Sequence, residues 1–546
     1  MWVLGVNAPP AGWHDAAACL VDAHGRVVAF SEEERLSRRR HSLFRGPKQA
    51  VRFCLESAGI SPGDVDVVAV GWDGAWMEAG RAHDSREALH AAIGWERSTQ
   101  AGAEVVNVPH HRAHATCAFH ASGYGRAGVL IVDGNGEREA TSVWSFEHGR
   151  EPRLLRWWPT AHSIGYAYDA ASRWLGFSLL DAGKTMGLAA YGRAEGLDAP
   201  ALVDLDDGDY RLLVTDPEGA QPENGRELAQ QYKRIVRAWE RRFAEIAEAG
   251  SPAAPAAELH LNPAAVKVAH CAQAMVEQTV GWLAEATRAL AGVPELCLAG
   301  GVALNCSTNG QLAAPIYVPP VPHDAGVALG AAWSVSPPRE RLQLSPYLGS
   351  DPGLVTEEVG IDGLARREWD AELVAGLLVA GQVGALVEGG AEIGPRALCH
   401  RSLIALPRPA DVGGRLNRLK HREPWRPFGP VALESSASGL WAGQGTLHDY
   451  MLGAAPVTEA GRAAAPAVVH VDATTRPQRV RDRDRTRIAD LLRELERGGV
   501  PGVLVNTSFN DRGEPIVNSA DDALRAFQAM DLDFLALEDE VLIRES

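Results

Sequence analysis

A stretch rich in proline, glycine and serine divides this chain into two parts. It covers residues 334–362 (SVSPPRERLQLSPYLGSDPGLVTEEVGID) and shows neither the 3.6-residue period of a helix nor the two-residue alternation of a strand. At 546 residues, the chain also exceeds what one hydrophobic core usually organises. We therefore predict two domains, residues 1–345 and residues 346–546.

Apolar patterns in both parts indicate α/β architecture, without an evident internal repeat. Residues 264–291 repeat apolar side chains at helical spacing and lead into a short strand, 295–299, that ends in a glycine turn. Residues 1–30 predict two strands joined by a turn. Residues 197–262 have the composition of an insertion around one charged helix, 226–249. In the second part the patterns predict strands at 382–388, 500–505 and 534–543 and a helix at 519–530.

Charge and cysteine usage exclude several classes of protein. A formal net charge of −17 disfavours general nucleic-acid binding, because phosphate backbones are met by basic surfaces. The seven cysteines are scattered and never form a CxxC pair, which disfavours a disulfide framework or zinc knuckle and fits a reducing cytoplasm. No window holds the roughly 20 uninterrupted apolar residues of a membrane helix, and no basic leader opens the chain. We expect a cytoplasmic protein with no nucleic-acid or membrane partner.

Two histidines in PHHRAHATCAFH are spaced for one face of a helix. His110 and His114 are four residues apart, so both imidazoles would project the same way and could bind a divalent transition metal. Asp133 ends an apolar strand in LIVDGNGE, and Asp324 opens a helix in VPHDAGVALG, positions typical of metal and phosphate sites in α/β folds. Surface or core histidines and an N-cap role for Asp324 remain open alternatives.

Three glycine-containing segments predict turns whose backbone can approach a phosphate. They contain Gly134 and Gly136, then Lys184 and Gly187, and finally Gly300, Gly301 and Asn305. Each alone is more typical of an ordinary tight turn than of a ligand site, but three of them in one domain favour a nucleotide cleft. Neither GxGxxG nor GxxxxGK[ST] occurs, which excludes the Rossmann and P-loop forms of such a cleft.

The segment 396–426 is basic within an otherwise acidic chain. It holds eight Lys or Arg residues against two acidic ones, among prolines, glycines and aromatic residues that would hold guanidinium groups rigidly. Rigid guanidinium forks select oxyanions such as phosphate and carbamate. Arg476 is a further candidate, and Asn506 and Ser508 would complete an anion pocket where a strand ends. A solvated charged face and a simple Asx or Ser turn are the alternatives.

The order of these segments resembles one known family, the NodU/CmcH carbamoyltransferases, over nearly the whole chain. The shared motifs are VNAPPAGWHDAAACLV, EEERLSRRRH, HHRAHA, VDGNGE, KTMGLAAYG, LAGGVALNC, GPRALCHRS, RLNRLKHREPWRPFGP and LVNTSFNDRGEPIV. The resemblance implies an N-terminal actin-like ATPase domain, similar to the enzyme that transfers threonylcarbamoyl to tRNA (TsaD-like), and a C-terminal YrdC-like α/β domain. It also implies that carbamoyl phosphate and ATP give carbamoyl adenylate, from which the carbamoyl group passes to a hydroxyl of a small molecule.

The resemblance further implies roles for individual residues. The ligands of Fe²⁺ or another divalent metal would be His110, His114, Asp133 and Asp324, with Mg²⁺ accompanying ATP. The groups that meet carbamoyl phosphate and ATP would be Arg396, Lys420, Arg426, Arg476, Asn506 and Ser508, with Lys420 and Ser508 taking part in catalysis. His14 would be the general base in the transfer step.

Two departures from the family pattern concern binding residues. Arg39 and Arg40 stand where the family commonly has a lysine, so one of these arginines is expected to supply a phosphate contact. In GGAEIGPRALCHRS, Ile393 replaces an aromatic residue and Cys399 replaces a glycine. Both changes bear on the shape of the carbamoyl phosphate pocket.

The acceptor is the least defined part of the expected reaction. A hydroxylated natural product such as an antibiotic is expected, and tryptophans at 72, 76, 95, 157 and 158 favour an apolar polyketide or macrolide, with core packing as the alternative. An actin-like small-molecule kinase or ATPase, a tRNA threonylcarbamoyl-transfer protein and a non-catalytic scaffold are the competing interpretations. A homodimer is also left open.

Overall fold

The computed structural model describes residues 1–8, 13–77, 82–95, 102–178, 180–206, 208–216, 218–252, 254–356, 363–443 and 445–544. The chain forms two compact units, Met1–Ser345 and Pro346–Ser546. Helix α11 ends at Val335, residues 336–356 of the predicted linker form neither helix nor strand, and its last part, 357–362, lies outside the described residues.

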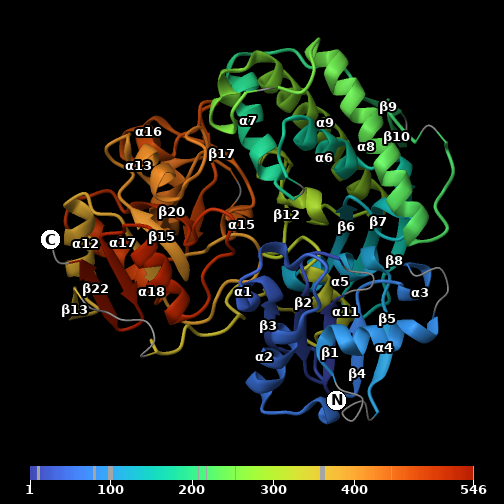
Figure 1. The fold of residues 1–546 in the computed structure, drawn as a ribbon, viewed down its shortest axis with the longest axis horizontal. Helices are drawn as coiled ribbons and strands as arrows, with labels where there is room; N and C mark the ends of the chain where they lie inside the picture. Colours follow the sequence, from blue (N-terminus) through green and yellow to red (C-terminus); the bar gives the residue numbers. More distant parts are fainter. Residues whose placement is uncertain are drawn as a thin grey trace. The chain divides into compact units, whose positions relative to one another are not determined.

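The first sheet of the N-terminal unit has the strand order β3-β2-β1-β4-β5 (Figure 1). Its strands are β1 (Val3–Asn7), β2 (Ala17–Val21), β3 (Val27–Glu32), β4 (Val67–Val70) and β5 (Glu104–Asn107). The first three strands pair antiparallel, and β1, β4 and β5 pair parallel. Continuous runs of buried Val, Leu and Ala in β1 and β4 are what a sheet covered on both faces requires.

The second sheet repeats this topology, with the order β12-β11-β6-β7-β8. Its strands are β6 (Arg126–Val132), β7 (Glu139–Glu147), β8 (Arg153–Pro159), β11 (Leu296–Ala299) and β12 (Ile316–Tyr317). Again three consecutive strands pair antiparallel. Of the two later strands, β11 pairs parallel with β6, and β12 pairs parallel with β11. This duplicated arrangement is the actin-like ATPase fold, although no internal repeat is evident in the sequence.

Helices α5 (His110–Ser122) and α11 (Gly326–Val335) pack directly against each other. A Cβ atom at Gly330 would lie 1.8 Å from the carbonyl oxygen of Ala113, so only glycine permits this approach. Because α11 also packs on β1 and α5 packs on β6 and β11, the helix pair joins the two sheets. This junction is the place where the candidate metal ligands meet.

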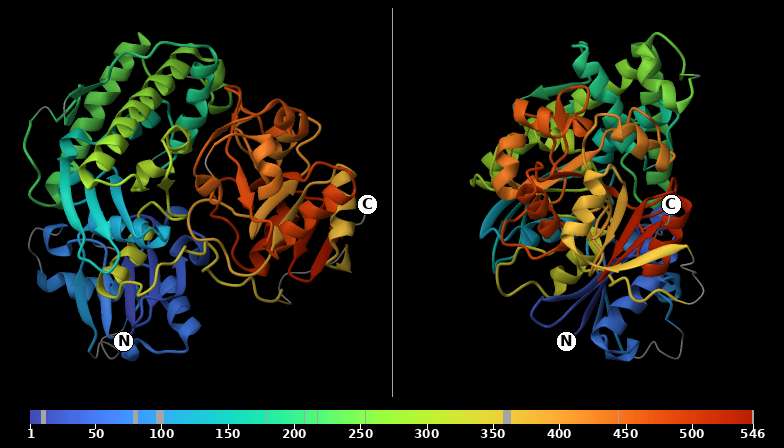
Figure 2. Two further views of the ribbon diagram at one scale, coloured as in Figure 1. Left: turned by 180° about the vertical axis from the view of Figure 1, so that it is seen from behind. Right: turned by 90° about the vertical axis from the view of Figure 1, so that its left-hand side faces the viewer.

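Helices α6 (Ile164–Trp174), α7 (Ala182–Ala194), α8 (Gly225–Ala247) and α9 (Pro263–Ala291) gather at one end of the N-terminal unit (Figure 2). The predicted long helix and the strand after it are confirmed as α9 and β11, and the predicted charged helix is confirmed as α8. In α9 the Asn262 side chain accepts a hydrogen bond from the Ala265 amide, Pro263 occupies the first turn, and Gly292 ends the helix.

The C-terminal unit is built on an eight-stranded mixed sheet with the order β13-β22-β21-β14-β15-β20-β16-β19. Its strands are β13 (Leu364–Glu368), β14 (Gly384–Val387), β15 (Arg401–Ala405), β16 (Gly429–Leu433), β19 (Gln478–Val480), β20 (Val503–Ser508), β21 (Phe534–Leu537) and β22 (Glu540–Arg544). Side chains alternate between two cores: Val503 and Val505 join one, and Leu504 joins the other.

Helices cover both faces of this sheet. The core that contains Leu504 lies under α12 (Ala371–Val379) and α17 (Arg487–Arg497), and the opposite core lies under α13 (Val412–Leu419) and α18 (Ala520–Ala529). The predicted helix 519–530 is confirmed as α18. The α/β class predicted for both parts of the chain is therefore confirmed.

Three local predictions are wrong in detail. The first 30 residues contribute to three strands, because Gly25 turns β2 back along β3; residues 9–12, within the β1–β2 connection, lie outside the described residues. The turn predicted around Lys184 and Gly187 is helix α7, whose packing against α9 outweighs the low helix propensity of its glycines. The last predicted strand is the hairpin β21–β22, which reverses at Glu538 while the apolar pattern continues.

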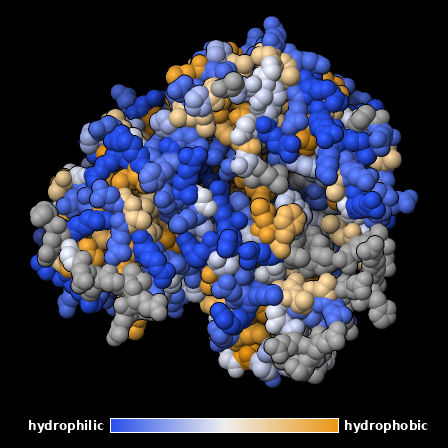
Figure 3. All heavy atoms as spheres, in the orientation of Figure 1, coloured by the Kyte–Doolittle hydropathy of each residue, from blue (hydrophilic) through white to orange (hydrophobic). Residues whose placement is uncertain are grey.

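The surface is that of a mostly hydrophilic protein. On the face drawn in Figure 3, hydrophilic residues predominate and the apolar ones lie in scattered groups. Among the described residues, no helix combines the length and the apolar character that crossing a membrane requires.

Candidate active site

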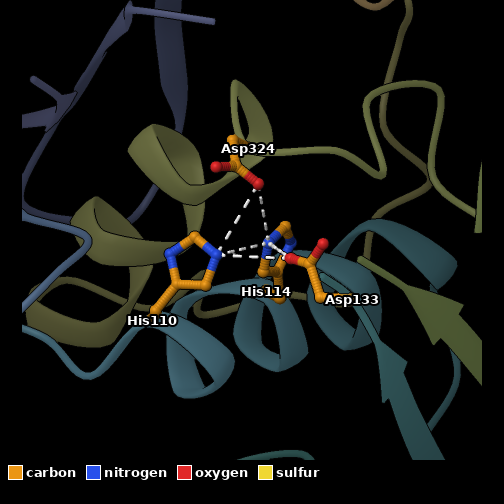
Figure 4. Close-up of side chains that lie close together, drawn as sticks. All are labelled: His110, His114, Asp133 and Asp324. Atoms are coloured by element: carbon orange, nitrogen blue, oxygen red, sulfur yellow. Dashed lines mark hydrogen bonds and ion pairs between the residues drawn. The ribbon is translucent and has the colours of Figure 1, made fainter. Parts of the chain in front are cut away.

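Four predicted ligands lie together in the N-terminal unit. His110 and His114 are neighbours on α5, and Asp133 and Asp324 point toward them from other elements (Figure 4). The two Nε2 atoms are 3.1 Å apart, and each lies 3.6 Å from Asp324 Oδ1. Asp133 Oδ2 lies 3.4 Å from His110 Nε2 and 3.2 Å from His114 Nε2. All four residues are buried, and their ligand atoms lie within 4.8 Å of one another.

Local structure determines the orientation of each of these four side chains. The two histidines share a face of α5 because they are one helical turn apart. Asp133 follows the last residue of β6, and its Oδ1 accepts hydrogen bonds from the amides of Gly134 (2.7 Å) and Gly301 (3.1 Å), which leaves Oδ2 facing the histidines. Asp324 stands before α11, whose N-cap is Ala325 and has no side-chain capping bond, so the N-cap alternative does not hold.

A second layer of contacts orients the imidazoles. His110 Nδ1 donates to the carbonyl oxygen of Gly71 (3.1 Å), which turns its Nε2 toward the carboxylates. The ring of Trp72 stacks on that of His110 at 3.7 Å. His111 does not belong to the four, since its Nδ1 lies 2.8 Å from Ser142 Oγ.

The electrostatics of the cluster favour a positive charge at its centre. Burial alone would raise the pKa of Asp324, but the charges of His14 and His110 outweigh burial and hold that pKa well below its usual value. Burial disfavours the imidazolium of His110, yet the charge of Asp324 and the hydrogen bond with Asp133 raise its pKa well above the usual value. Two imidazole nitrogens and two carboxylate oxygens converging on one point are a donor set that suits a divalent transition ion.

His14 borders this cluster. Its Nε2 lies 3.6 Å from Asp324 Oδ2, and its Nδ1 lies 2.9 Å from Asp15 Oδ2. Burial opposes protonation of His14, but the charge of Asp324 and the hydrogen bond with Asp15 raise its pKa to about 9. The Asn7 amide group donates to the carbonyl oxygens of His14 and Asp15, so the backbone there is held to β1. The structure thus places the predicted base beside the predicted metal ligands.

The predicted phosphate turns differ in their surroundings. Gly134 and Gly301 meet at Asp133, so two of the three turns converge on the cluster. Gly300 has a φ of 92°, and a Cβ there would lie 2.3 Å from the carbonyl oxygen of Val132. Gly136 donates its amide to Glu139, which closes the turn after Asp133. Asn305 bonds to Gln273 and to the Thr308 amide, which anchors the third turn to α9 and α10 (Cys306–Asn309).

Lys184 lies near Arg40, one of the two arginines that stand where the family commonly has a lysine. Lys184 Nζ lies 3.2 Å from Asp181 Oδ2, and Arg40 Nη2 lies 3.3 Å from Asp181 Oδ1. Arg39 precedes Arg40 and is exposed, and Gly187 lies one turn beyond Lys184 in α7. Arg40, and not Arg39, is therefore the arginine that the structure joins to Lys184.

A cluster of cations occupies the C-terminal unit around the end of β20. Lys420 Nζ donates to the carbonyl oxygen of Ser508, to the carbonyl oxygen of Asn510 (2.9 Å) and to Asn510 Oδ1 (3.0 Å). Burial and the charges of Arg422 and Arg426 lower the pKa of Lys420 well below its usual value. Burial and the charges of Arg426 and Arg476 likewise lower the pKa of Arg422. Charges affect a pKa strongly only at short range, so Arg426 and Arg476 lie near Lys420 and Arg422.

Backbone contacts bring two more predicted residues, Asn506 and Arg396, to this place. Asn506 is opposite Gly429 in the β16–β20 pair, and a Cβ at Gly429 would lie 2.3 Å from the carbonyl oxygen of Arg476. Asn506 Nδ2 donates to the carbonyl oxygen of Ala397 (3.0 Å), the residue after Arg396. The loop 394–399, strand β20 and the segment before β19 therefore lie close together.

The basic run as a whole does not form the pocket. Arg401 is fully buried and donates to the backbone carbonyl oxygens of Ser350, Glu388, Gly389, His400 and Asn518, which makes it structural. Arg415 pairs with Asp533 at 2.7 Å. Sequence reasoning missed Arg422 and Asp15 as site residues, although one lies in the basic run and the other follows His14. The tryptophans predicted to favour an apolar acceptor are largely packed: Trp72, Trp95 and Trp158 are buried, whereas Trp157 is 45% exposed.

Comparison with known proteins gives the family. The family model described as carbamoyltransferase N-terminus matches residues 3–84 and 86–333, and the one described as carbamoyltransferase C-terminus matches residues 375–544. The nodulation protein NolNO of Sinorhizobium fredii is 34% identical over 97% of this chain and 79% of its own length. A nodulation protein U of Bradyrhizobium diazoefficiens is 28% identical over 92% of this chain and 91% of its own length.

Among solved structures, component A of (R)-2-hydroxyglutaryl-CoA dehydratase from Acidaminococcus fermentans covers 61% of this chain and 97% of its own at 14% identity, with a TM-score of 0.33. Full-length HypF in a phosphate- and nucleotide-bound form covers 63% of this chain and 56% of its own at 13% identity, with a TM-score of 0.32. The two family models together span most of the sequence, and the chain belongs to the carbamoyltransferase family.

Proposed function

We propose that this protein is an ATP-dependent O-carbamoyltransferase that makes carbamoyl adenylate in its C-terminal unit and transfers the carbamoyl group in its N-terminal unit. The observation that carries the proposal is the cation cluster of Lys420, Arg422, Arg426 and Arg476. Burial and the charges of Arg422 and Arg426 lower the pKa of Lys420, and burial and the charges of Arg426 and Arg476 lower the pKa of Arg422, which is unfavourable unless a polyanion binds there. Carbamoyl phosphate and the triphosphate of ATP with Mg²⁺ are such polyanions.

The chemistry explains why an adenylate is needed. The nitrogen and the anionic oxygen of carbamate both donate electrons into the carbonyl group, so carbamate is a poor electrophile. With one water, carbamoyl phosphate and ATP give carbamoyl adenylate, phosphate and pyrophosphate. Arg396, Arg426 and Arg476 would bind phosphate oxygens, and Lys420 would stabilise the charge that develops as pyrophosphate leaves. Ser508, whose Oγ is 3.4 Å from Lys420 Nζ, would orient the reacting phosphate.

Transfer would take place at the histidine–aspartate cluster. His110, His114, Asp133 and Asp324 would hold a divalent ion, with Fe²⁺ as the proposed metal, and this ion would polarise the carbamoyl carbonyl as a Lewis acid. The amides of Gly134 and Gly301 fix the Asp133 carboxylate. The glycine turns, Arg40 and Lys184 would bind the phosphate of the adenylate. If Asp133 and Asp324 bind the metal ion, the ion neutralises their charges, and these no longer favour the protonated form of His14. His14 then returns toward its neutral form and accepts the acceptor's hydroxyl proton.

An apolar natural product is the proposed acceptor, with a polyketide or macrolide favoured. The edge of the Trp13 ring meets the ring of His14 at 4.3 Å between centroids, and Phe44, 5.7 Å from Trp13, is 77% exposed. Exposed aromatic surface next to the proposed base suits an apolar ring system that carries a hydroxyl.

The test combines two measurements. Purified protein is supplied with carbamoyl phosphate, Mg²⁺-ATP, Fe²⁺ and a panel of hydroxylated natural products, and we expect AMP and pyrophosphate release together with a product that has gained one carbamoyl group by mass spectrometry. Release of ADP and a phosphorylated product would instead indicate an actin-like kinase. Turnover that does not depend on carbamoyl phosphate would refute the proposal.

A further inference from the structure

The amide of Asn506 has one end bound and the other end unpaired. Asn506 lies on β20 and is 1% exposed. Its Nδ2 donates to the carbonyl oxygen of Ala397 at 3.0 Å and to Gln478 Oε1 at 2.5 Å. Its Oδ1 is buried and has no hydrogen-bond partner among the described residues. An unpaired buried acceptor is unfavourable, and a bound molecule with a hydrogen-bond donor would satisfy it.

Gln478 fixes which end of this amide is unpaired. Its Nε2 donates to the carbonyl oxygen of Leu398 (3.2 Å), and its Oε1 accepts from Asn506 Nδ2 and from the Cys399 thiol (3.1 Å). Backbone carbonyl oxygens only accept hydrogen bonds, so those of Ala397 and Leu398 set the orientation of both side-chain amides. Asn506 cannot flip without placing its oxygen against Ala397 O and Gln478 Oε1.

Asn506 lies near residues that contact the cation cluster. Asn506 and Ser508 are two residues apart on β20 and face the same side, which separates them by roughly 7 Å, and Lys420 contacts Ser508. Gly429, opposite Asn506, packs against the backbone of Arg476. Arg422 and Arg476 each have a buried Nε without a hydrogen-bond partner among the described residues. This part of the C-terminal unit thus offers cationic donors for anionic oxygens and, on the same strand as Ser508, one acceptor for an N–H group.

Carbamoyl phosphate has this pattern of groups, since its phosphate carries the anionic oxygens and its amide nitrogen carries the N–H donors. We propose that Gln478 is a positioning residue that locks the Asn506 amide with Oδ1 toward the substrate, and that this lock selects carbamoyl phosphate over acyl phosphates without an N–H group. The inference rests on the proposed function, because it assumes that the cation cluster binds carbamoyl phosphate.

Binding of two nearly isosteric ligands tests the lock. Acetyl phosphate has a methyl group where carbamoyl phosphate has its amide nitrogen, so it retains the phosphate contacts and lacks the N–H donor. Calorimetric titration without ATP should show that Gln478→Met, a change of similar volume, raises the Kd for carbamoyl phosphate about five- to tenfold, the value of one hydrogen bond. The Kd for acetyl phosphate should change less than about twofold. A purely structural role of Gln478 would weaken both ligands alike.

The matched control is Gln528→Met, the same substitution at an exposed position of α18, which should leave both Kd values unchanged. Equal weakening of both ligands by Gln478→Met, or weakening of neither, would overturn the inference. A shift in the KM for ATP with an unchanged Kd for carbamoyl phosphate would also overturn it, since Asn506 would then bind the nucleotide. Wild-type protein that prefers carbamoyl phosphate but releases no pyrophosphate with ATP would refute the adenylation step and leave the role of Gln478 intact.

Discussion

His110 Nε2 and His114 Nε2 lie 3.1 Å apart, and both are 3.6 Å from the same oxygen of Asp324. One helical turn brings the two nitrogens together, whereas Asp324 arrives from the other half of the unit. The cluster therefore depends on the contact between α5 and α11.

Loss of one histidine should remove metal binding. His114→Ala leaves two carboxylates and one imidazole. Loss of only the hydrogen-bond partner of a ligand lowers metal affinity roughly 10- to 100-fold, so loss of the ligand itself should lower the affinity for Fe²⁺ further. Metal content measured by mass spectrometry should drop, and carbamoyl transfer should stop while pyrophosphate release continues. His24→Ala, at an exposed histidine, is the control. Full metal content in His114→Ala would contradict this assignment.

His14→Asn should separate the two half-reactions. The variant loses the proposed proton acceptor beside Asp324, so transfer should slow by about 10²- to 10⁴-fold. Adenylate formation should be unaffected because its proposed residues lie in the C-terminal unit. Pyrophosphate release and product carbamoylation are measured in parallel. If adenylate formation is lost in this variant, the proposed role of His14 is wrong.

Lys420→Ala should have the opposite effect. Removing the ammonium group that binds Ser508 and Asn510 should abolish pyrophosphate release, while metal content stays at the wild-type value. Lys420→Met, which keeps most of the side-chain volume, should fold and show the same loss. Normal pyrophosphate release by a folded Lys420→Met protein would exclude Lys420 from the reaction.

Stability should depend on pH through Glu388. Burial, with the charge of Glu538, raises the pKa of Glu388 from 4.5 to about 7, although Arg487 opposes the shift. The folded state therefore binds this proton more tightly than the unfolded state. The contribution to stability is complete below the unfolded pKa of 4.5 and is lost as the pH rises through about 7. Between these limits the unfolding free energy of wild type relative to Glu388→Gln should fall by on the order of 1–3 kcal/mol. Melting curves of both proteins across this range check the sign; a constant Tm difference would refute it.

The helix contact under the metal ligands should be intolerant of a methyl group. Gly330→Ala places a Cβ against the carbonyl oxygen of Ala113, so we expect a loss of at least about 2 kcal/mol and weaker metal binding as α5 and α11 move apart. The control is Gly376→Ala in α12, where a Cβ would meet no atom of the described residues within 4 Å. This change should stabilise the protein by about 0.5–1 kcal/mol. Equal Tm values for Gly330→Ala and wild type would show that the contact is not tight.

Local features of the site could be predicted from the sequence because their causes are local. Helix α9 follows from its apolar period and its caps, and the shared direction of His110 and His114 follows from their four-residue spacing. Chain reversals without a glycine or proline signal could not be predicted: the β21–β22 hairpin turns at Glu538, and nothing in the apolar pattern distinguishes it from one longer strand.

The sequence by itself determined the family, the α/β class and the residue types available for chemistry, since motifs and periodicity are properties of short segments. Tertiary structure alone decided which of those residues meet. Asp133 and Asp324 converge because two sheets of the same topology are joined through the Gly330 contact, and Gln478 reaches Asn506 because β19 and β20 flank β16. The basic run was separated in the same way: folding buried Arg401 among backbone carbonyls and brought Lys420, Arg422 and Arg426 together as a cluster of cations. Such long-range pairings depend on packing between distant segments, and no short stretch of sequence encodes them.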